Sequence, residues 1–365
     1  MSTKRLKIGV IGCGAIAQSQ HLPNLAERPD IWEVAAVCDV SPGLVEAVGK
    51  RFQVPRRYTD YQALLQSDVD AVLLCLADPK TPAALAAARA GKHMLIEKPM
   101  CWTVAEAEQI IAAGREAGVV VMAAYMKQHE PGFQYAREKI QAMTDVRFIE
   151  VNHLHPNNAL HMRDFFIERF DDVPAAESQA LETLRDQTRA AAIGADATPA
   201  ERYAFGMLIG SMIHDISCLR GLFGPPERVV SAEIWHEGRG FSTVLAYPDE
   251  RRCVMSWVDL PNLWDFQETL EVYGADERVI ISFATGFSRG QPTTVTVQGT
   301  EAGAPFRKEL VMSHDPGFKR EIEQFHASIL GDQQPLTLPE GARDDAALVA
   351  EIMAVARRQR AVERQ

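Results

Sequence analysis

The stretch LKIGVIGCGAIA, Leu6 to Ala17, joins a short apolar run to a turn with the spacing G-x-G-x-x-A. In a strand–turn–helix unit, Gly12 allows the tight turn and Gly14 lets other atoms approach the backbone closely. Ala17 permits the helix to pack closely on the strand. The stretch therefore predicts the first β–α unit of a parallel, doubly wound sheet.

The sequence up to about residue 125 repeats this alternation of apolar runs and helical patterns. Near-continuous apolar runs such as AVLLCLA are typical of strands that are covered on both faces of a sheet. The predicted strands are Leu6–Ile11, Glu33–Cys38, Ala71–Leu76, His93–Ile96 and Val119–Ala124.

After residue 145 the pattern changes to alternating, β-branched runs that are separated by turns such as YPDE. These runs predict a mostly antiparallel, open sheet in a second α/β domain. They are Val146–Leu154, Val229–Trp235, Phe241–Tyr247, Thr269–Tyr273, Val279–Phe283 and Thr293–Val297. We expect a Rossmann domain at 1–125, a substrate-binding and oligomerisation domain at 126–340, and a C-terminal helix at 341–365 that packs back on the body.

Composition excludes several classes of protein. The net charge of -11 argues against nucleic-acid and membrane partners, and no apolar run approaches the length of a membrane span. The six cysteines form no CxxC pair, which favours reduced thiols and a cytoplasmic protein.

Asp39 ends the second predicted strand, VAAVCD, downstream of the glycine turn. A carboxylate at this position hydrogen-bonds the adenosine ribose of a dinucleotide and repels a 2′-phosphate, so the pattern predicts NAD rather than NADP. The alternative is that the turn only tightens a β–α junction and that Asp39 caps the next helix.

Further motifs give a resemblance to a known family. They are EKP at 97–99, YMKQHEP at 125–131, the histidine in LIGSMIHDISCLRGLFGPP, and the closing pattern from Phe318 through the helix at Asp344. Together with GCGAIA and Asp39, the chain resembles the Gfo/Idh/MocA family of sugar and cyclitol dehydrogenases over nearly its whole length. The resemblance implies a Rossmann domain followed by an α/β domain with an open sheet.

The resemblance also implies catalytic roles. Lys98 is expected to contact the reacting hydroxyl, and Pro99, after a cis peptide, to aim it; His214 is expected to act as acid, base or hydroxyl ligand. A partly buried lysine suits proton transfer because desolvation lowers the pKa of an ammonium group. The alternative is that Lys98 is an exposed ion-pair partner at a strand end. The expected cofactor-binding residues are Gly12, Gly14, Ala15, Ile16, Asp39, Glu97 and Pro99.

The chain departs from the family pattern near His214. Gly210 and Ser217 stand where relatives carry aspartates, so other residues must grip the substrate. The candidate substrate ligands are Lys127, His153, His155 and Asp215. The H-x-H spacing would also permit a metal with His161 or His214 as third ligand, but we predict no metal.

These patterns predict an NAD-dependent oxidoreductase that acts on a secondary alcohol of a sugar, glycoside or inositol, in a homodimer or homotetramer. Two alternatives stay open. The enzyme could retain NAD and oxidise transiently during isomerisation or glycoside cleavage, or the chain could be a non-catalytic nucleotide-binding sensor.

Overall fold

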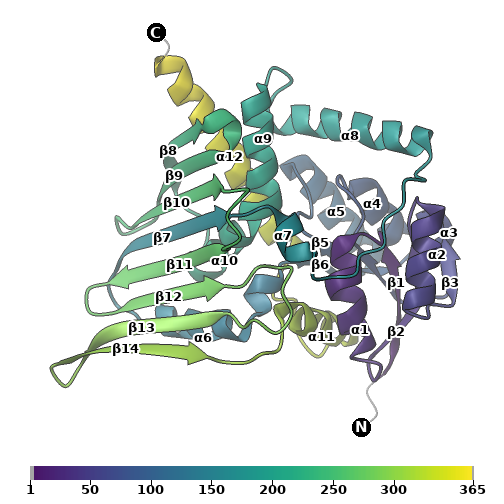
Figure 1. The fold of residues 1–365 in the computed structure, drawn as a ribbon, viewed down its shortest axis with the longest axis horizontal. Coiled ribbons are helices and arrows are strands. Elements are labelled where there is room, and N and C mark those ends of the chain that lie inside the picture. Colours follow the sequence, from purple (N-terminus) through teal and green to yellow (C-terminus); the bar gives the residue numbers. More distant parts are fainter. Residues whose placement is uncertain (1–3, 364–365) are drawn as a thin grey trace. The chain divides into compact units, whose positions relative to one another are not determined.

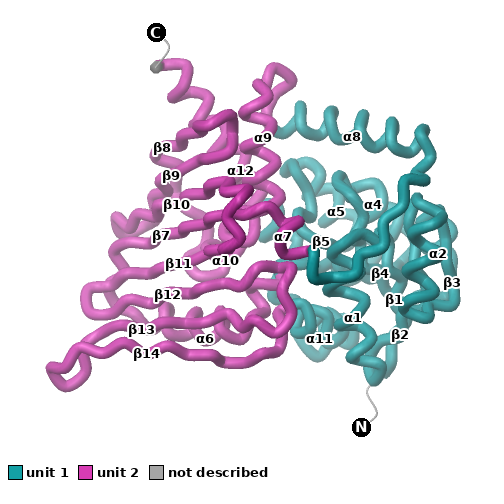
Figure 2. Tube along the Cα trace, viewed as in Figure 1, with its two compact units in different colours: residues 1–125, 163–192, 318–343 teal, residues 126–162, 193–317, 344–365 magenta. Residues whose placement is uncertain are grey.

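The computed structural model describes residues 4–363 and divides the chain into two compact units (Figure 2). Unit 1 contains Met1–Tyr125, Arg163–Ala192 and Phe318–Arg343, and unit 2 contains Met126–Met162, Ile193–Gly317 and Asp344–Gln365. Two segments from the region predicted as the substrate domain therefore group with the N-terminal sequence.

Unit 1 is built on a six-stranded parallel sheet in the order β3-β2-β1-β4-β5-β6 (Figure 1). The order reverses between β1 and β4, which is the switch point of a Rossmann sheet. The strands are β1 (Leu6–Ile11), β2 (Trp32–Cys38), β3 (Arg56–Tyr58), β4 (Ala71–Leu74), β5 (His93–Glu97) and β6 (Val121–Ala124).

Several helices of unit 1 begin at ordinary capping signals. Ser41 caps α2 and Thr103 forms a capping box with Glu106 at the start of α5. The elements are η1 (Ala17–His21), α1 (Leu22–Ala26), α2 (Pro42–Arg51), α3 (Tyr61–Leu65), α4 (Thr81–Arg89), α5 (Val104–Ala117), α8 (Ala175–Ile193) and α11 (Gly317–Leu330).

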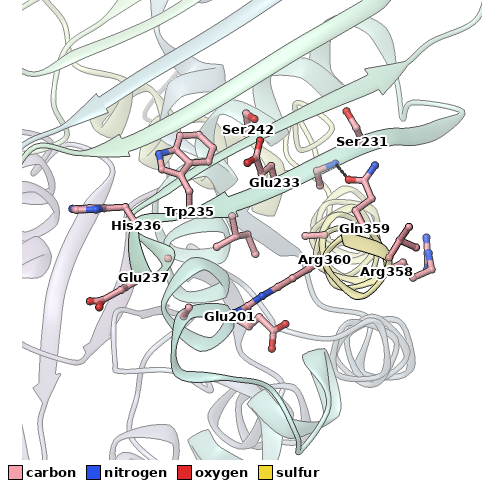
Figure 3. A pocket seen from close by; sticks show the side chains of 16 residues that line it. Glu201, Ser231, Glu233, Trp235, His236, Glu237, Ser242, Arg358, Gln359 and Arg360 are labelled. Carbon is pink, nitrogen blue, oxygen red and sulfur yellow. Dashed lines mark hydrogen bonds between the residues drawn. The ribbon is translucent and has the colours of Figure 1, made fainter. Parts of the chain in front are cut away.

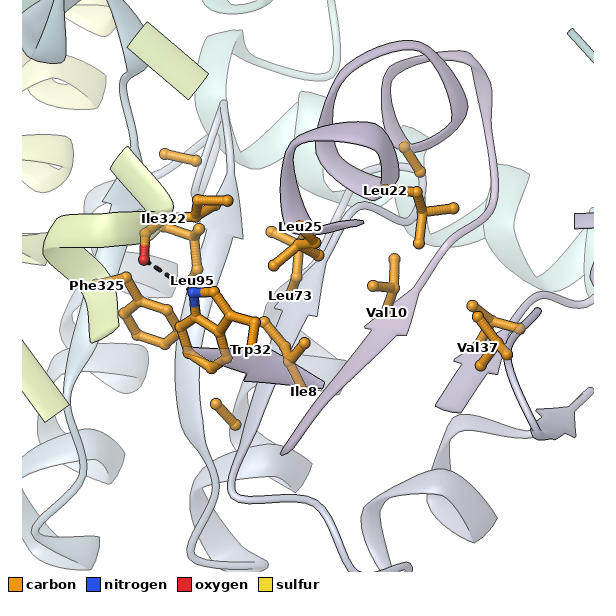
Figure 4. Close-up of a cluster of buried hydrophobic side chains, with 14 of the residues drawn as sticks. Ile8, Val10, Leu22, Leu25, Trp32, Val37, Leu73, Leu95, Ile322 and Phe325 are labelled. Atoms are coloured by element: carbon orange, nitrogen blue, oxygen red, sulfur yellow. Dashed lines mark hydrogen bonds between the residues drawn. The ribbon is translucent and has the colours of Figure 1, made fainter. Parts of the chain in front are cut away.

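The core of unit 1 includes side chains from α11, far along the sequence (Figure 4). The ring of Trp32 stacks on Phe325 with a centroid distance of 5.8 Å, and its Nε1 donates to the carbonyl of Ile322 at 3.1 Å. This hydrogen bond satisfies the one polar group of the buried indole, so α11 completes the Rossmann core.

Unit 2 is built on an eight-stranded sheet in the order β14-β13-β12-β11-β7-β10-β9-β8 (Figure 1). All neighbouring pairs are antiparallel except β7 with β10, so the predicted fold class is confirmed. The strands are β7 (Val146–His155), β8 (Arg228–Trp235), β9 (Gly240–Ala246), β10 (Arg252–Asp259), β11 (Gln267–Gly274), β12 (Arg278–Phe283), β13 (Thr294–Glu301) and β14 (Ala304–Val311).

Every second residue of the central strands of unit 2 is buried, as in a sheet with one covered face. Helix α12 lies against β8, where Glu351 and Gln359 accept backbone N–H groups of that strand. The helical elements are η2 (Met126–His129), α6 (Pro131–Gln141), α7 (Asn158–Met162), α9 (Pro199–Met207), η3 (Leu208–Met212), α10 (Ile213–Phe223), η4 (His236–Gly238) and α12 (Pro339–Glu363).

Three strands were not predicted. Strand β3 is only three residues long and carries two arginines, and β14 is mostly exposed, so neither shows an apolar pattern. Strand β10 does alternate between buried and half-buried residues and was overlooked.

The six cysteines, all within the described residues, are free thiols. Among residues 4–363, no helix combines the length and the apolar character that a membrane span requires.

Candidate functional site

The glycine turn of unit 1 has the geometry that the sequence predicts. Gly12 has a φ of +97°, and an added Cβ there would lie 2.4 Å from the backbone nitrogen of Leu76, so only glycine fits. At Gly14 an added Cβ would meet no atom within 4 Å. The backbone of the turn is therefore open to close approach by another group, which suits a pyrophosphate.

Asp39 follows β2, and its carboxylate points back to this turn. Its Oδ2 accepts the backbone N–H of Cys13 at 2.8 Å, and its Oδ1 accepts that of Ser41 at 3.0 Å. These two bonds fix the carboxylate beside the glycine turn. The donors of the turn and this acceptor fit the phosphates and the adenosine ribose of a dinucleotide.

Glu97, Lys98 and Pro99 follow one another at the carboxyl end of β5. Glu97 is buried, and its Oε1 lies 3.0 Å from Nε2 of His21. Burial raises the pKa of Glu97, but the bond from His21 and the charges of Lys98 and Lys80 outweigh that effect and lower the pKa. Lys98 is half-buried, and the expected cis peptide before Pro99 is present.

Lys80 is a contributor to this region that the sequence analysis missed. Its side chain is buried, pairs with Asp78, and donates from Nζ to the carbonyl of Pro99 at 3.2 Å. His21 therefore contacts the Glu97 side chain on one side of Lys98, and Lys80 binds the Pro99 carbonyl on the other.

Unit 2 holds a cluster of polar side chains, four of them buried and His155 half-buried, which we call the acid–histidine cluster: Lys127, His153, His155, Asp215 and Glu268. Lys127 is 3% exposed and forms an ion pair with Glu268. The Lys127 Nζ also lies 4.9 Å from the ring centroid of Phe283. The structure thus gives Lys127 a protein carboxylate as its partner.

His153 and His155 lie on the same face of β7, as their spacing predicts. His153 Nδ1 lies 3.0 Å from Oδ2 of Asp215, and its Nε2 lies 3.1 Å from Nδ1 of His155. Asp215 is fully buried at the start of α10. The His155 ring stacks on Trp257 with a centroid distance of 5.8 Å. His153 and Asp215 therefore bind each other, and their contact with a substrate stays a prediction.

Burial sets the protonation of this cluster. It raises the pKa of Asp215 to about 6, and together with the charge of Asp215 it raises the pKa of Glu268. Burial and the charge of His153 lower the pKa of His155 to about 4. A carboxyl pair of this kind holds a proton more readily than isolated acids do.

Three side chains of the cluster could also bind a metal. His153, Asp215 and Glu268 each offer one ligand atom, and these atoms lie within 4.8 Å of one another. The ammonium group of Lys127 already contributes a positive charge at Glu268, where it would repel a metal cation. The absence of a metal stays a prediction, and neither histidine that was considered as a third ligand, His161 or His214, belongs to this triplet.

His214 lies on α10, directly after the π-helical turn η3 that contains Gly210. The prediction placed these two residues one regular helical turn apart, but a π turn holds more residues per turn and rotates Gly210 relative to His214. An added Cβ at Gly210 would meet no atom within 4 Å. The Ser217 hydroxyl donates to the carbonyl of His214 at 2.9 Å, so it is engaged within the helix.

A pocket of about 790 Å³ in unit 2 lies between α9, β8 and α12 (Figure 3). Glu201, Trp235, His236 and Arg358 are among its lining residues. The lining shares no residue with the acid–histidine cluster or with any predicted site residue.

Comparison with known proteins supports the assignment of unit 1. Residues 6–125 match the family model described as "Oxidoreductase family, NAD-binding Rossmann fold". Inositol 2-dehydrogenase of Salmonella typhimurium is 32% identical over 132 residues, which are 35% of this chain and 39% of that protein. A dTDP-3,4-didehydro-2,6-dideoxy-alpha-D-glucose 3-reductase of Actinomadura kijaniata is 35% identical over 142 residues, 34% of this chain and 38% of that protein. The match thus spans about two fifths of these relatives.

Two solved structures share the whole fold. The 3-ketoreductase KijD10 of Actinomadura kijaniata, solved with NADP and TDP-benzene, has a TM-score of 0.73 at 20% identity. The alignment covers 96% of this chain and 98% of KijD10. The UDP-N-acetylglucosamine 3-dehydrogenase GnnA of Acidithiobacillus ferrooxidans has a TM-score of 0.72 at 18% identity, covering 97% and 98%.

The parallel sheet, the glycine turn and the carboxylate after β2 define a dinucleotide-binding protein of the Rossmann class. Residues 6–125 are accordingly similar to the NAD-binding Rossmann domain of the Gfo/Idh/MocA oxidoreductases.

Proposed function

We propose that the chain is an NAD-dependent oxidoreductase that transfers hydride between a secondary alcohol of a sugar, glycoside or inositol and the nicotinamide. The observation that carries this proposal is Lys98, which follows β5 at the carboxyl end of the Rossmann sheet, where such sheets bind their ligands. The sugar and inositol names of the relatives support the substrate class.

Lys98 handles the proton of the reacting hydroxyl. When an alcohol is oxidised, this proton leaves as hydride departs from the same carbon, and a group held at the oxygen must accept it. Bound NAD supplies the hydride acceptor. Lys80 binds the Pro99 carbonyl and His21 binds the Glu97 side chain, so both neighbours of Lys98 are held in place.

His214 is the proposed second catalytic residue, acting as acid, base or ligand of a substrate hydroxyl. His155, which is half-buried, is a candidate substrate ligand. Lys127 pairs with Glu268 and His153 pairs with Asp215, and these contacts hold the acid–histidine cluster together.

NAD is the proposed coenzyme because Asp39 presents a carboxylate at the ribose position and only Val40 and Ser41 follow it. We further propose a cytoplasmic homodimer or homotetramer, consistent with the free thiols and with a sheet that has one uncovered face.

A panel of sugars, glycosides and inositols, assayed with NAD by NADH absorbance, tests the proposal. We expect at least one member to yield free NADH in a 1:1 ratio with its keto product. Product without accumulated NADH would indicate an enzyme that retains its nucleotide. No conversion of any member, with NAD binding intact, would favour a non-catalytic sensor.

A further inference from the structure

A segment from the middle of the chain crosses the carboxyl edge of the Rossmann sheet within unit 1. This crossing segment, residues 163–192, contacts the loops or the helical elements that follow four different strands. Glu168 meets Gln18 after β1, and Asp172 meets Ser41 and Gly43 after β2. Farther along, Arg185 donates to the carbonyl of Asp78 after β4, and Arg189 lies over the ring of Trp102 after β5.

Gln18 anchors the crossing segment next to the glycine turn. Its side-chain amide is buried and makes two bonds to the backbone of Glu168, donating at 3.1 Å and accepting at 2.9 Å. The same Nε2 donates to the carbonyl of Cys13 at 2.8 Å. One side chain therefore ties the crossing segment to the turn that would hold the pyrophosphate.

Asp172 occupies the beginning of helix α2. Its Oδ2 accepts the backbone N–H of Gly43 at 2.6 Å, and its Oδ1 accepts the hydroxyl of Ser41, the N-cap residue. An added Cβ at Gly43 would lie 2.4 Å from the ring of Phe170 and 2.8 Å from Oδ2 of Asp172, so glycine admits the segment here. The bonds from Ser41 and Gly43 lower the pKa of Asp172, which keeps it charged at neutral pH.

Two carboxylates therefore converge on Ser41: Asp39 accepts its backbone N–H, and Asp172 accepts its hydroxyl. If Asp39 binds the adenosine ribose, a 2′-phosphate on that ribose would point toward the residues that follow Asp39. The backbone N–H groups at the start of α2 are the donors that would hold such a phosphate. Asp172 already accepts the N–H of Gly43 and adds a second negative charge beside Asp39.

We infer that Asp172 is a coenzyme-selecting residue. It occupies the start of α2, more than a hundred residues away in the sequence, and thereby excludes NADP. This inference rests on the proposed binding of NAD and refines its specificity. A 2′-phosphate carries up to about two negative charges, and the Asp172 carboxylate would repel them. Replacing Asp172 by a neutral residue should remove its share of the repulsion.

The test compares Asp172→Asn with Asp171→Asn in the full-length protein. Both substitutions remove one acidic residue, but Asp171 is exposed and makes no contact with α2 in the hydrogen bonds and ion pairs of the described residues. Calorimetric titration with NAD and with NADP, after removal of bound nucleotide, gives both dissociation constants without any substrate. Matching thermal midpoints would establish that the variants are folded.

We expect Asp172→Asn to tighten NADP binding by about 10-fold while NAD binding changes by less than about 2-fold. Asp171→Asn should leave both constants near the wild-type values. An equal change for both nucleotides, or equal behaviour of the two variants, would overturn the role of Asp172. A wild-type protein that binds neither nucleotide would instead refute the proposed function on which the inference rests.

Discussion

The candidate side chains of unit 1 lie within a few residues of strand ends, whereas those of unit 2 come from four separate elements. Gly12, Asp39 and Lys98 follow β1, β2 and β5 directly, so each is positioned by local chain geometry. Lys127 and Glu268 come from η2 and β11 and meet only because both are buried in the same place. The first kind of site depends on backbone conformation, and the second depends on charge balance in a core.

The largest expected effect, on thermal stability, tests whether the unit 2 cluster depends on its charge balance. Lys127→Met would leave Glu268 and Asp215 without their buried cation, a change that typically costs about 3 kcal/mol or more. We expect the thermal midpoint of unfolding to fall by about 10 °C.

Lys139→Met is the matched control. Lys139 pairs with Glu277 at 2.8 Å, but both side chains are about one-third exposed. Its loss should move the midpoint by no more than about 2 °C. Equal shifts for the two variants would mean that burial does not distinguish the acid–histidine cluster from a surface pair.

Lys98→Met tests the local site of unit 1. It should lower kcat by about 100-fold, the range expected when a positioned acid or base is lost, while leaving NAD affinity and the thermal midpoint nearly unchanged. Lys50→Met, which removes an exposed lysine of α2, serves as the control. Wild-type turnover by Lys98→Met would show that the EKP motif is structural here.

A pH effect of intermediate size is expected at Glu130 in unit 2. Burial raises its pKa from 4.5 to about 7, so the folded state holds the proton more tightly than the unfolded chain. The protonated Glu130 side chain therefore contributes its full stabilisation of the folded state below about pH 4.5, and this stabilisation is lost as the pH rises to 7 and above. Glu130→Gln keeps an oxygen that can accept the N–H of Gly317 and removes the titration.

At pH 8 we therefore expect Glu130→Gln to be more stable than the wild type by roughly 3 kcal/mol, and the difference to vanish near pH 4. Urea unfolding across this range measures it. Glu138→Gln, at an exposed position of the same helix, should follow the wild-type curve. A difference that stays constant with pH would contradict the raised pKa.

The smallest expected effect concerns Gly210, which lies in η3 just before the helix that carries His214 and Asp215. Because an added Cβ meets no atom there, Gly210→Asp should leave the thermal midpoint within about 2 °C. We expect KM for the native substrate to rise by about 3-fold, since a charged group fills space that the substrate uses. A higher kcat/KM would show instead that the missing carboxylate limits the wild-type enzyme.

The sequence predicted the local features well for a physical reason. A glycine with positive φ, a carboxylate after a strand and a proline after a lysine all leave signatures within a few residues. Both sheets were predicted from hydrophobic periodicity, which gives no signal where strands are short or exposed, as in β3 and β14.

Features that depend on distant contacts could not be predicted in this way. Glu268 is a charged residue at a buried position of β11, and this departure from the apolar pattern can be seen in the sequence. The sequence does not reveal that Lys127 and Asp215 surround it. The grouping of residues 163–192 with unit 1 depends on bonds such as that of Asp172 with Gly43, across 129 positions. The π turn at Gly210 likewise leaves no sequence signature that we recognise.

Hydride transfer itself is tested most directly by isotopic labelling. The protein would be incubated with NAD and with the active member of the substrate panel, carrying deuterium on the carbon that is oxidised. The account predicts that deuterium appears at C4 of the nicotinamide of NADH, observed by NMR, and that Lys98→Met slows its appearance. NADH without deuterium, or oxidised product with the label released to water, would contradict direct transfer between the alcohol and the nucleotide.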